Sequence, residues 1–249
     1  MDAARALSTI VIGAVVGFLG GLFGKGGSAL ATPLLHATGV PGFAAVASPL
    51  PATIPSALAA ARRYRDLDLI DGQLLAWTVA AGVPATLVGS LGSQLVGGDA
   101  LVLITELVLI VLGLRIMLGR GDPDERTDDA VAPWRFAAVA IGAGLGAGLL
   151  ANAGGFLLAP LFVTVLHRPL KVAFGTSLAA ASVLALPGTL AHALLGHIDW
   201  TLTALFAAAS IPLASLGARV ALRTRTERLA RAYGTFLVAT SVALIIVAR

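Results

Sequence analysis

The sequence predicts an all-α, polytopic membrane protein made of two inverted repeats, each a glycine-broken helical hairpin followed by three transmembrane helices. Three observations support this prediction. Of the 249 residues, 57% are hydrophobic and only 12% are charged, so no long segment has the polarity of a soluble surface. Apolar runs long enough to cross about 30 Å of hydrocarbon recur along the chain. Glycines, prolines and aspartates also recur at matching positions in the two halves.

The repeat is defined by residues that seldom match by chance. Gly26-Gly27 aligns with Gly154-Gly155, and the same register pairs further glycines, prolines and aspartates. These further pairs are Pro41 with Pro169, Ile70-Asp71 with Ile198-Asp199, Pro84 with Pro212, and Gly89 with Gly217. The register divides the chain into a first membrane repeat at 1–118, a hydrophilic linker at 119–133 and a second membrane repeat at 134–249.

Within each repeat we expect an apolar run, a glycine break, a short apolar run and three further helices. In the first repeat these segments are 7–23, 29–38, 43–61, 71–96 and 100–118; in the second they are 134–150, 156–166, 172–195, 200–222 and 229–248. The first segment is uncharged and carries Gly13, Gly17 and Gly21 at four-residue spacing, which is typical of a closely packed membrane helix. We expect this segment to be retained, and cleavage as a signal peptide is the alternative.

The first break reads GLFGKGGSAL, residues 21–30. It is not a nucleotide loop, because residues 46–55 hold no carboxylate for a dinucleotide and Gly26 stands where a triphosphate loop needs Ser or Thr. Backbone groups freed by a break cost several kcal/mol each in hydrocarbon, so the break must be buried or line a wet cavity. The N–H groups of helix N-termini at such a break favour an anion.

We therefore predict that a small anionic substrate binds at the two breaks. The predicted residues are Lys25, Gly26, Gly27 and Ser28 in the first repeat, and Asn152, Gly154 and Gly155 in the second. Lys25 supplies the counter-charge, and Asn152 can donate hydrogen bonds at the equivalent position. The alternative for Lys25 is a hairpin tip whose ammonium group reaches the aqueous face.

Prolines indicate further irregular backbone beside this site. The stretch SPLPATIP, residues 48–55, carries three prolines, and Pro187 should interrupt the corresponding helix of the second repeat. Discontinuous helices at matched positions point to a midplane site. Hydroxyl groups available there are those of Ser48, Thr53, Thr176 and Ser177. The alternative is that these hydroxyls bond to their own or a neighbouring helix.

Glu106 is an acidic residue within the apolar segment 100–118. Such a group must face the protein interior, pair with another group or titrate. A proton-coupling role is one hypothesis for Glu106. Only about six residues separate it from the start of the segment, so a position near the membrane interface is the favoured alternative.

Equivalent loops carry opposite charge character. The link 62–65 is basic, whereas its counterpart 190–194 has no lysine or arginine. Conversely, 96–99 has no positive charge, whereas its counterpart 224–228 is basic. Because cytoplasmic loops concentrate Lys and Arg, we expect inverted repeats with a cytoplasmic linker and both termini outside. Eight ordinary helices with scattered arginines are the alternative.

Composition also limits the chemistry. The formal charge is +4, but the basic residues lie mainly in short links between apolar runs, so we expect no nucleic-acid partner. The chain has no cysteine, which excludes disulfides and thiolate metal sites. The four histidines are not spaced as a metal motif. We expect no metal, no cofactor and no enzymatic activity.

Four stretches together resemble the sulfite exporter TauE/SafE family of membrane permeases. They are GLFGKGGSALATPLL and AVASPL in the first half, and LANAGGFLLAPLF and AFGTSL in the second. The resemblance covers nearly the whole chain and implies transport of small anions, such as sulfite or sulfonates, across the bacterial inner membrane. The chain departs from the family pattern at Lys25, Ser28, Pro49 and Asn152.

The leading hypothesis is therefore a secondary transporter for a small anion in the lipid bilayer, driven by a proton or sodium gradient. One repeat would rock against the other to alternate access. A membrane-embedded enzyme and a non-transporting scaffold are the alternatives. Assembly into a homo-oligomer is left open.

Overall fold

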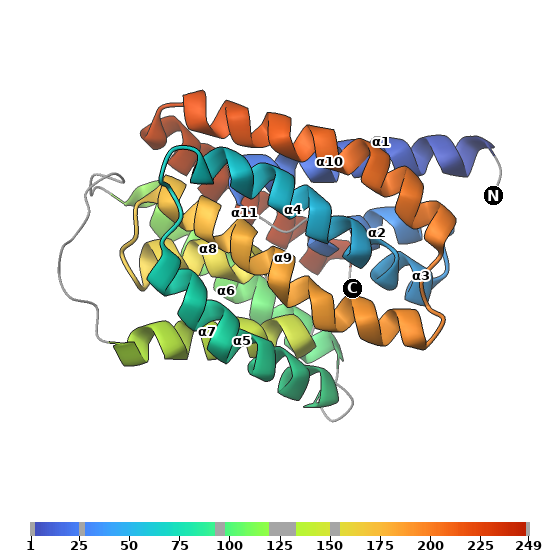
Figure 1. Cartoon of the computed structure of the whole chain (residues 1–249), viewed down its shortest axis with the longest axis horizontal. Coiled ribbons are helices and arrows are strands. Elements are labelled where there is room, and N and C mark those ends of the chain that lie inside the picture. The colour runs from blue at the N-terminus through green and yellow to red at the C-terminus, as the bar shows by residue number, and fades with distance from the viewer. Residues whose placement is uncertain (1–2, 25–27, 93–97, 120–132, 150–154, 248–249) are drawn as a thin grey trace.

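The computed structural model describes residues 3–24, 28–92, 98–119, 133–149 and 155–247, and all regular structure within these ranges is helical (Figure 1). The helices are α1 Ala3–Phe23, α2 Ser28–Ala37, α3 Gly42–Ala47, α4 Pro49–Arg65, α5 Gly72–Gly92, α6 Gly98–Leu118, α7 Pro133–Leu149, α8 Gly155–Thr164, α9 Leu170–Leu194, α10 Trp200–Arg223 and α11 Thr226–Val247. The predicted all-α class is confirmed.

Six helical stretches of the described residues are long and apolar enough to cross a membrane. They are Ala3–Phe23, Gly42–Arg65, Gly72–Gly89, Leu170–Leu194, Trp200–Arg223 and Thr226–Ile246. Their outer faces carry exposed apolar side chains, such as Leu7, Val11 and Val15 at four-residue spacing on α1. A continuous apolar stripe facing outward suits lipid and not water. The protein is a multi-pass membrane protein.

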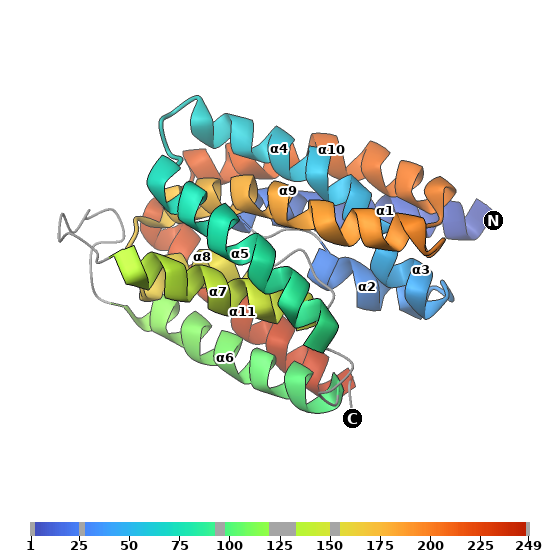
Figure 2. The same ribbon diagram turned by 60° about the horizontal axis from the view of Figure 1, so that its bottom comes forward.

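The two halves of the chain are interlocked. α1 packs on α10, α7 packs on α5, α4 packs on α9, and α6 packs on α11, so each pair takes one helix from each half (Figure 2). α9 is the central helix. It contacts α4, α5, α8 and α11, and 72% of its apolar stretch is buried inside the protein. The major helix contacts therefore join the repeats to each other.

Glycines allow the closest of these contacts. A Cβ added at Gly13 would lie 2.7 Å from the carbonyl oxygen of Phe206. Cβ atoms added at Gly17 and Gly21 would meet the backbone of Ser210 and Ala214, so three successive turns of α1 lie directly on the backbone of α10. The close packing predicted from the glycine spacing is confirmed.

The contact between α5 and α7 has the same construction. A Cβ at Gly144 of α7 would meet the carbonyl oxygen of Gly82 on α5. Gly89 and Gly217, which the sequence repeat pairs, both lie against the first helix of the opposite repeat. Gly89 approaches Leu145 and Leu149, and Gly217 approaches Phe18 and Leu22. Equivalent glycines therefore serve equivalent helix crossings.

Helix directions in the two halves are opposite in Figures 1 and 2. α1 starts at the end marked N and α7 starts at the other end. After each of them the chain turns back, along α2 in the first half and along α8 in the second. These directions are those that an inverted duplication requires, although the inversion with respect to a membrane stays a prediction.

Proline has different effects at its two predicted positions. The expected segment 43–61 is divided at Ser48 into α3 and α4, in agreement with the proline-rich stretch there. The expected break at Pro187 is wrong, because α9 runs without interruption from Leu170 to Leu194. A proline removes one backbone hydrogen bond, and membrane helices tolerate this where neighbouring helices pack around them. Here α4 and α5 pack against α9.

Candidate functional site

The first helix ends inside the protein at Gly24. This residue adopts φ +65°, a conformation that side chains other than glycine rarely adopt. A Cβ at this position would lie 2.6 Å from the Cα of Phe174 on α9. Both the backbone conformation and the lack of space therefore require glycine where α1 stops.

Ser177 on α9 binds the carbonyl of Gly24, the residue that directly follows α1. Its hydroxyl donates to the carbonyl oxygen of Gly24 at 2.7 Å, and the carbonyl of Phe174 lies 3.0 Å away as a second acceptor. Ser177 is fully buried. A helix end without a partner would be costly at this depth. The second repeat therefore satisfies the end of α1 in the first.

Aromatic side chains surround the same helix end. Phe23 stacks on Phe236 with 4.8 Å between ring centroids, and it also contacts Tyr233 at 5.5 Å. Phe174 meets Tyr233 edge to face at 4.8 Å. Tyr64 is fully buried, and its hydroxyl makes a long contact of 3.5 Å with the carbonyl oxygen of Gly21. These contacts connect α1, α4, α9 and α11 around the first break.

Ser48 and Thr176 form two matching joints between the repeats. The backbone N–H of Asp71 donates to the hydroxyl of Thr176 at 3.0 Å, and that of Asp199 donates to the hydroxyl of Ser48 at 3.0 Å. Each aspartate also caps the helix that it precedes, because Asp71 accepts from the N–H of Leu74 and Asp199 from that of Leu202. The two hydroxyls lie at equivalent positions of the repeats and make the same bond.

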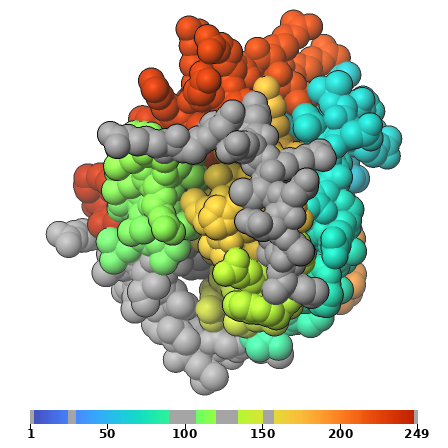
Figure 3. Space-filling view, turned by 90° about the vertical axis from the view of Figure 1, so that its left-hand side faces the viewer, coloured from blue at the N-terminus to red at the C-terminus, as the bar shows by residue number. Residues whose placement is uncertain are grey.

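One of these joints carries an additional salt bridge. The guanidinium of Arg168, in the link between α8 and α9, lies 3.0 Å from a carboxylate oxygen of Asp71. The side chains are only 23% and 18% exposed. Arg168 also lies over the ring of Phe136 on α7, with 5.4 Å from Cζ to the centroid. Figure 3 looks onto this end, where the yellow segment that contains the end of α8 lies in the middle.

The structure describes only part of the predicted substrate site. Lys25, Gly26, Gly27, Asn152 and Gly154 lie outside the described residues. Ser28 begins α2, Gly155 begins α8, and Glu106 belongs to α6. Ser177 lies beside the first break, whereas Ser48 and Thr176 lie at the joints described above. Thr53 bonds to the carbonyl of Pro49 in its own helix. Contact between these residues and a substrate stays a prediction.

Asp71, Asp199 and Arg168 were not predicted as site residues. The signal for the two aspartates was available, because Ile70-Asp71 and Ile198-Asp199 are among the pairs that define the repeat. The match between these two aspartates would have indicated that both have the same structural role. The position equivalent to Arg168 in the first repeat is the uncharged Val40, so the duplication contains no signal for the salt bridge.

The fold defines the class of the protein: a multi-pass helical membrane protein in which the long helices α1 and α7 are each followed by a separate short helix, α2 and α8. Residues 9–244 match the family described as Sulfite exporter TauE/SafE. The chain therefore belongs to this family of membrane proteins, and the resemblance noted in the sequence is confirmed.

Curated relatives agree with the family. The chain is 33% identical over 251 residues to a protein of Xylella fastidiosa strain 9a5c named "Probable membrane transporter protein", with 95% of this chain and 94% of the relative covered. It is 25% identical over 239 residues to "Probable membrane transporter protein YunE" of Bacillus subtilis strain 168, with 85% of each chain covered. No solved structure matches the chain. The protein is a membrane transporter, and its partners include the lipid bilayer and a small substrate.

Proposed function

We propose that the protein is a secondary transporter that moves a small anion, such as sulfite, a sulfonate or another organosulfur compound, across the bacterial inner membrane. The substrate binds between the two breaks, with Lys25 as counter-charge and the glycine backbones of both repeats as hydrogen-bond donors. This proposal combines the predicted site residues with the family to which the chain belongs.

One observation supports the location of the site more than any other. α2 begins at Ser28 and α8 begins at Gly155, in both cases within the length of the bundle (Figure 1). Each then runs back toward the end from which the preceding helix, α1 or α7, starts. Helix N-termini at such a depth present unpaired N–H groups and the positive end of the helix dipole. In transporters built from repeats, substrate sites lie where discontinuous helices of this kind meet.

The neighbouring contacts fit a rigid anion site. Ser177 and the ring cluster of Phe23, Phe174 and Tyr233 hold the end of α1 with hydroxyl and aromatic groups. These groups are neutral, so Lys25 would supply the full positive charge. In a low-dielectric interior that single charge would select strongly for an anion.

The proposed orientation follows from charge. Basic residues occur in the last turn of α4 and of α10, and both helices end at the side where α7 begins (Figure 1). By the positive-inside rule this side is cytoplasmic. Alternating access would then come from one repeat rocking against the other. A coupling proton carried by Glu106, sodium as the alternative coupling ion, and homo-oligomer formation remain predictions.

Counterflow in proteoliposomes tests the function. Vesicles that contain the purified protein are loaded with unlabelled sulfite, and the entry of radiolabelled sulfite is followed. We expect counterflow with sulfite or a sulfonate. For Lys25→Ala we expect the apparent KM to rise on the order of tenfold or more, because a charge-assisted contact is lost. Lys25→Arg should retain part of the affinity because it keeps the charge.

Lys171 provides the matched control, since it is the other lysine of the chain and its ammonium donates to the carbonyl of Leu222 at 3.3 Å, at the end of α10. Lys171→Ala should leave the apparent KM unchanged. Equal affinity in wild type, Lys25→Ala and Lys25→Arg would end the proposal for this residue. Chemical conversion of the anion without counterflow would instead indicate an enzyme. The absence of both counterflow and conversion would indicate a non-transporting scaffold.

A further inference from the structure

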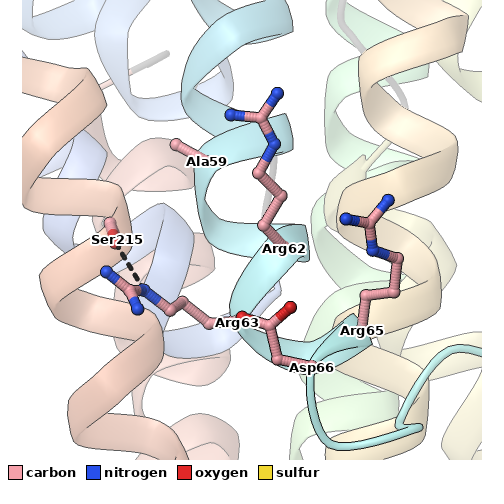
Figure 4. Close-up of a pocket in the computed structure, with 6 residues that line it drawn as sticks. All are labelled: Ala59, Arg62, Arg63, Arg65, Asp66 and Ser215. Carbon is pink, nitrogen blue, oxygen red and sulfur yellow. Dashed lines mark hydrogen bonds between the residues drawn. The ribbon is translucent and has the colours of Figure 1, made fainter.

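A pocket of about 330 Å³ lies between α4 and α10. Its lining residues are Ala59, Arg62, Arg63, Arg65, Asp66 and Ser215. Figure 4 shows three guanidinium groups from the last turn of α4 around it, with Ser215 on the facing helix. The pocket thus concentrates positive charge at one end of the membrane bundle.

The arginines of the pocket are only partly engaged. Arg63 donates from Nε to the hydroxyl of Ser215 at 3.0 Å, which fixes its guanidinium across the gap between the two helices. Arg62 and Arg65 are exposed, and neither has a carboxylate within ion-pair distance among the described residues. Asp66 is the one acidic residue of the lining, so the pocket keeps a net positive charge.

Apolar surface continues from the pocket along both helices. Leu58 lies one turn before Arg62 on α4 and is 42% exposed, and Leu216 follows Ser215 on α10 and is 46% exposed. A cationic pocket at the end of such an apolar face has the two components of a phospholipid site: donors for the phosphate, and a surface for the acyl chains.

We propose that this pocket binds the phosphate headgroup of an anionic phospholipid. Arg62 and Arg65 contact the phosphate, because guanidinium groups bind phosphate through paired N–H donors. Arg63 is held by Ser215 and contributes charge and shape. The acyl chains lie along Leu58 and Leu216. The site is independent of the transported substrate and of the proposed function.

The position of the pocket favours a lipid over a transported anion. Tyr64 lies in the same turn of α4 but points the other way: it is fully buried and its hydroxyl faces Gly21 of α1. Arg62 and Arg65 are exposed, so they lie on the outer side of the helix, whereas Tyr64 lies on the side that faces α1. An anion in the pocket would be at the periphery of the bundle, next to lipid.

Lipid binding to the purified full-length protein tests the proposal. The dissociation constants for phosphatidylglycerol, phosphatidylcholine and inorganic phosphate are measured in detergent micelles, for example by native mass spectrometry or by the rise in Tm. Wild-type protein should prefer phosphatidylglycerol. The variant Arg62→Gln/Arg65→Gln should bind phosphatidylglycerol on the order of tenfold or more weakly, because it removes the paired N–H donors that contact the phosphate directly.

A charge-matched control is available on α11. Arg228→Gln/Arg231→Gln removes the same charge from exposed residues at the same end of the bundle, and it should leave phosphatidylglycerol binding within about twofold of wild type. If the double pocket variant does not fold, the single variant Arg62→Gln should still show a severalfold loss. Equal losses in pocket and control variants would overturn the proposal, since they would indicate a general charge effect. Inorganic phosphate that binds as well as phosphatidylglycerol would also overturn it in favour of a free-anion site.

Discussion

At the scale of single residues, the end of α1 depends on groups supplied by the other half of the chain. Gly24 has a positive φ and lies against the backbone of Phe174. The hydroxyl of Ser177 donates a hydrogen bond to the carbonyl oxygen of Gly24. Without these contacts, the backbone groups at the end of the helix would lack hydrogen-bond partners in the membrane interior, and each unsatisfied group costs several kcal/mol. The end of α1 is fixed by its contacts with Phe174 and Ser177. A fixed helix end is suited to a break that holds a ligand.

Gly24→Ala should destabilise the protein by about 2 kcal/mol or more, because it adds an unfavourable backbone conformation and a clash with α9. Thermal unfolding in detergent measures this as a lower Tm. Gly142→Ala is the control, since a Cβ there has nothing within 4 Å, and alanine is favoured over glycine in a helix by up to about 1 kcal/mol. Equal Tm values for wild type and Gly24→Ala would show that the turn at α1 is not constrained as described.

At the scale of helices, the same hydrogen-bonded joint occurs once in each half of the chain, and a salt bridge is added at one of the two. Both α5 and α10 start at an aspartate whose N–H donates to a hydroxyl of the opposite repeat. Only at Asp71 does the structure describe an arginine beside the carboxylate, namely Arg168. The joint at that end of the bundle should therefore be the stronger of the two.

Asparagine substitution separates the salt bridge from the helix cap, because asparagine also caps helices. We expect Asp71→Asn to cost about 1 kcal/mol more than Asp199→Asn, since only the former removes a partly buried ion pair. The free energies of unfolding of both variants, and of Arg168→Ala with and without Asp71→Asn, would be compared as a double-mutant cycle. Additive effects of Arg168→Ala and Asp71→Asn would show that the two groups are not coupled.

At the scale of the whole molecule, the chain ends and the basic links lie apart. α1 starts, and α11 ends, at the side where α9 passes into α10 (Figures 1 and 2). The basic ends of α4 and α10 lie at the opposite side. Charge therefore divides the bundle into one basic end and one end with few basic residues, which is the distribution that sets orientation in membranes.

Both termini should accordingly lie outside the cytoplasm. Reporter proteins fused at Met1 and at Arg249, one kind active only in the cytoplasm and the other only outside, would locate them in whole cells. A reporter inserted in the linker 119–133 should give the opposite result, which controls for expression. Cytoplasmic signals from both ends would reverse the proposed orientation.

The sequence by itself determined the class of the protein, the helix-rich segments and the close packing at Gly13, Gly17 and Gly21. Each of these depends on local composition or on periodic spacing, because the length of an apolar run and the size of a side chain act wherever the segment is placed. The family resemblance depends on the same short motifs.

Only the tertiary structure decided which groups hold the breaks and the joints. Ser177 bonds to Gly24, Thr176 bonds to Asp71, and Arg168 pairs with Asp71, all between residues far apart in the chain. The continuity of α9 through Pro187 likewise depends on the helices packed around it. The physical reason is the same in each case: a hydroxyl, a carboxylate or a proline in a membrane helix has a local alternative, and only the neighbours that the fold supplies determine which alternative is adopted.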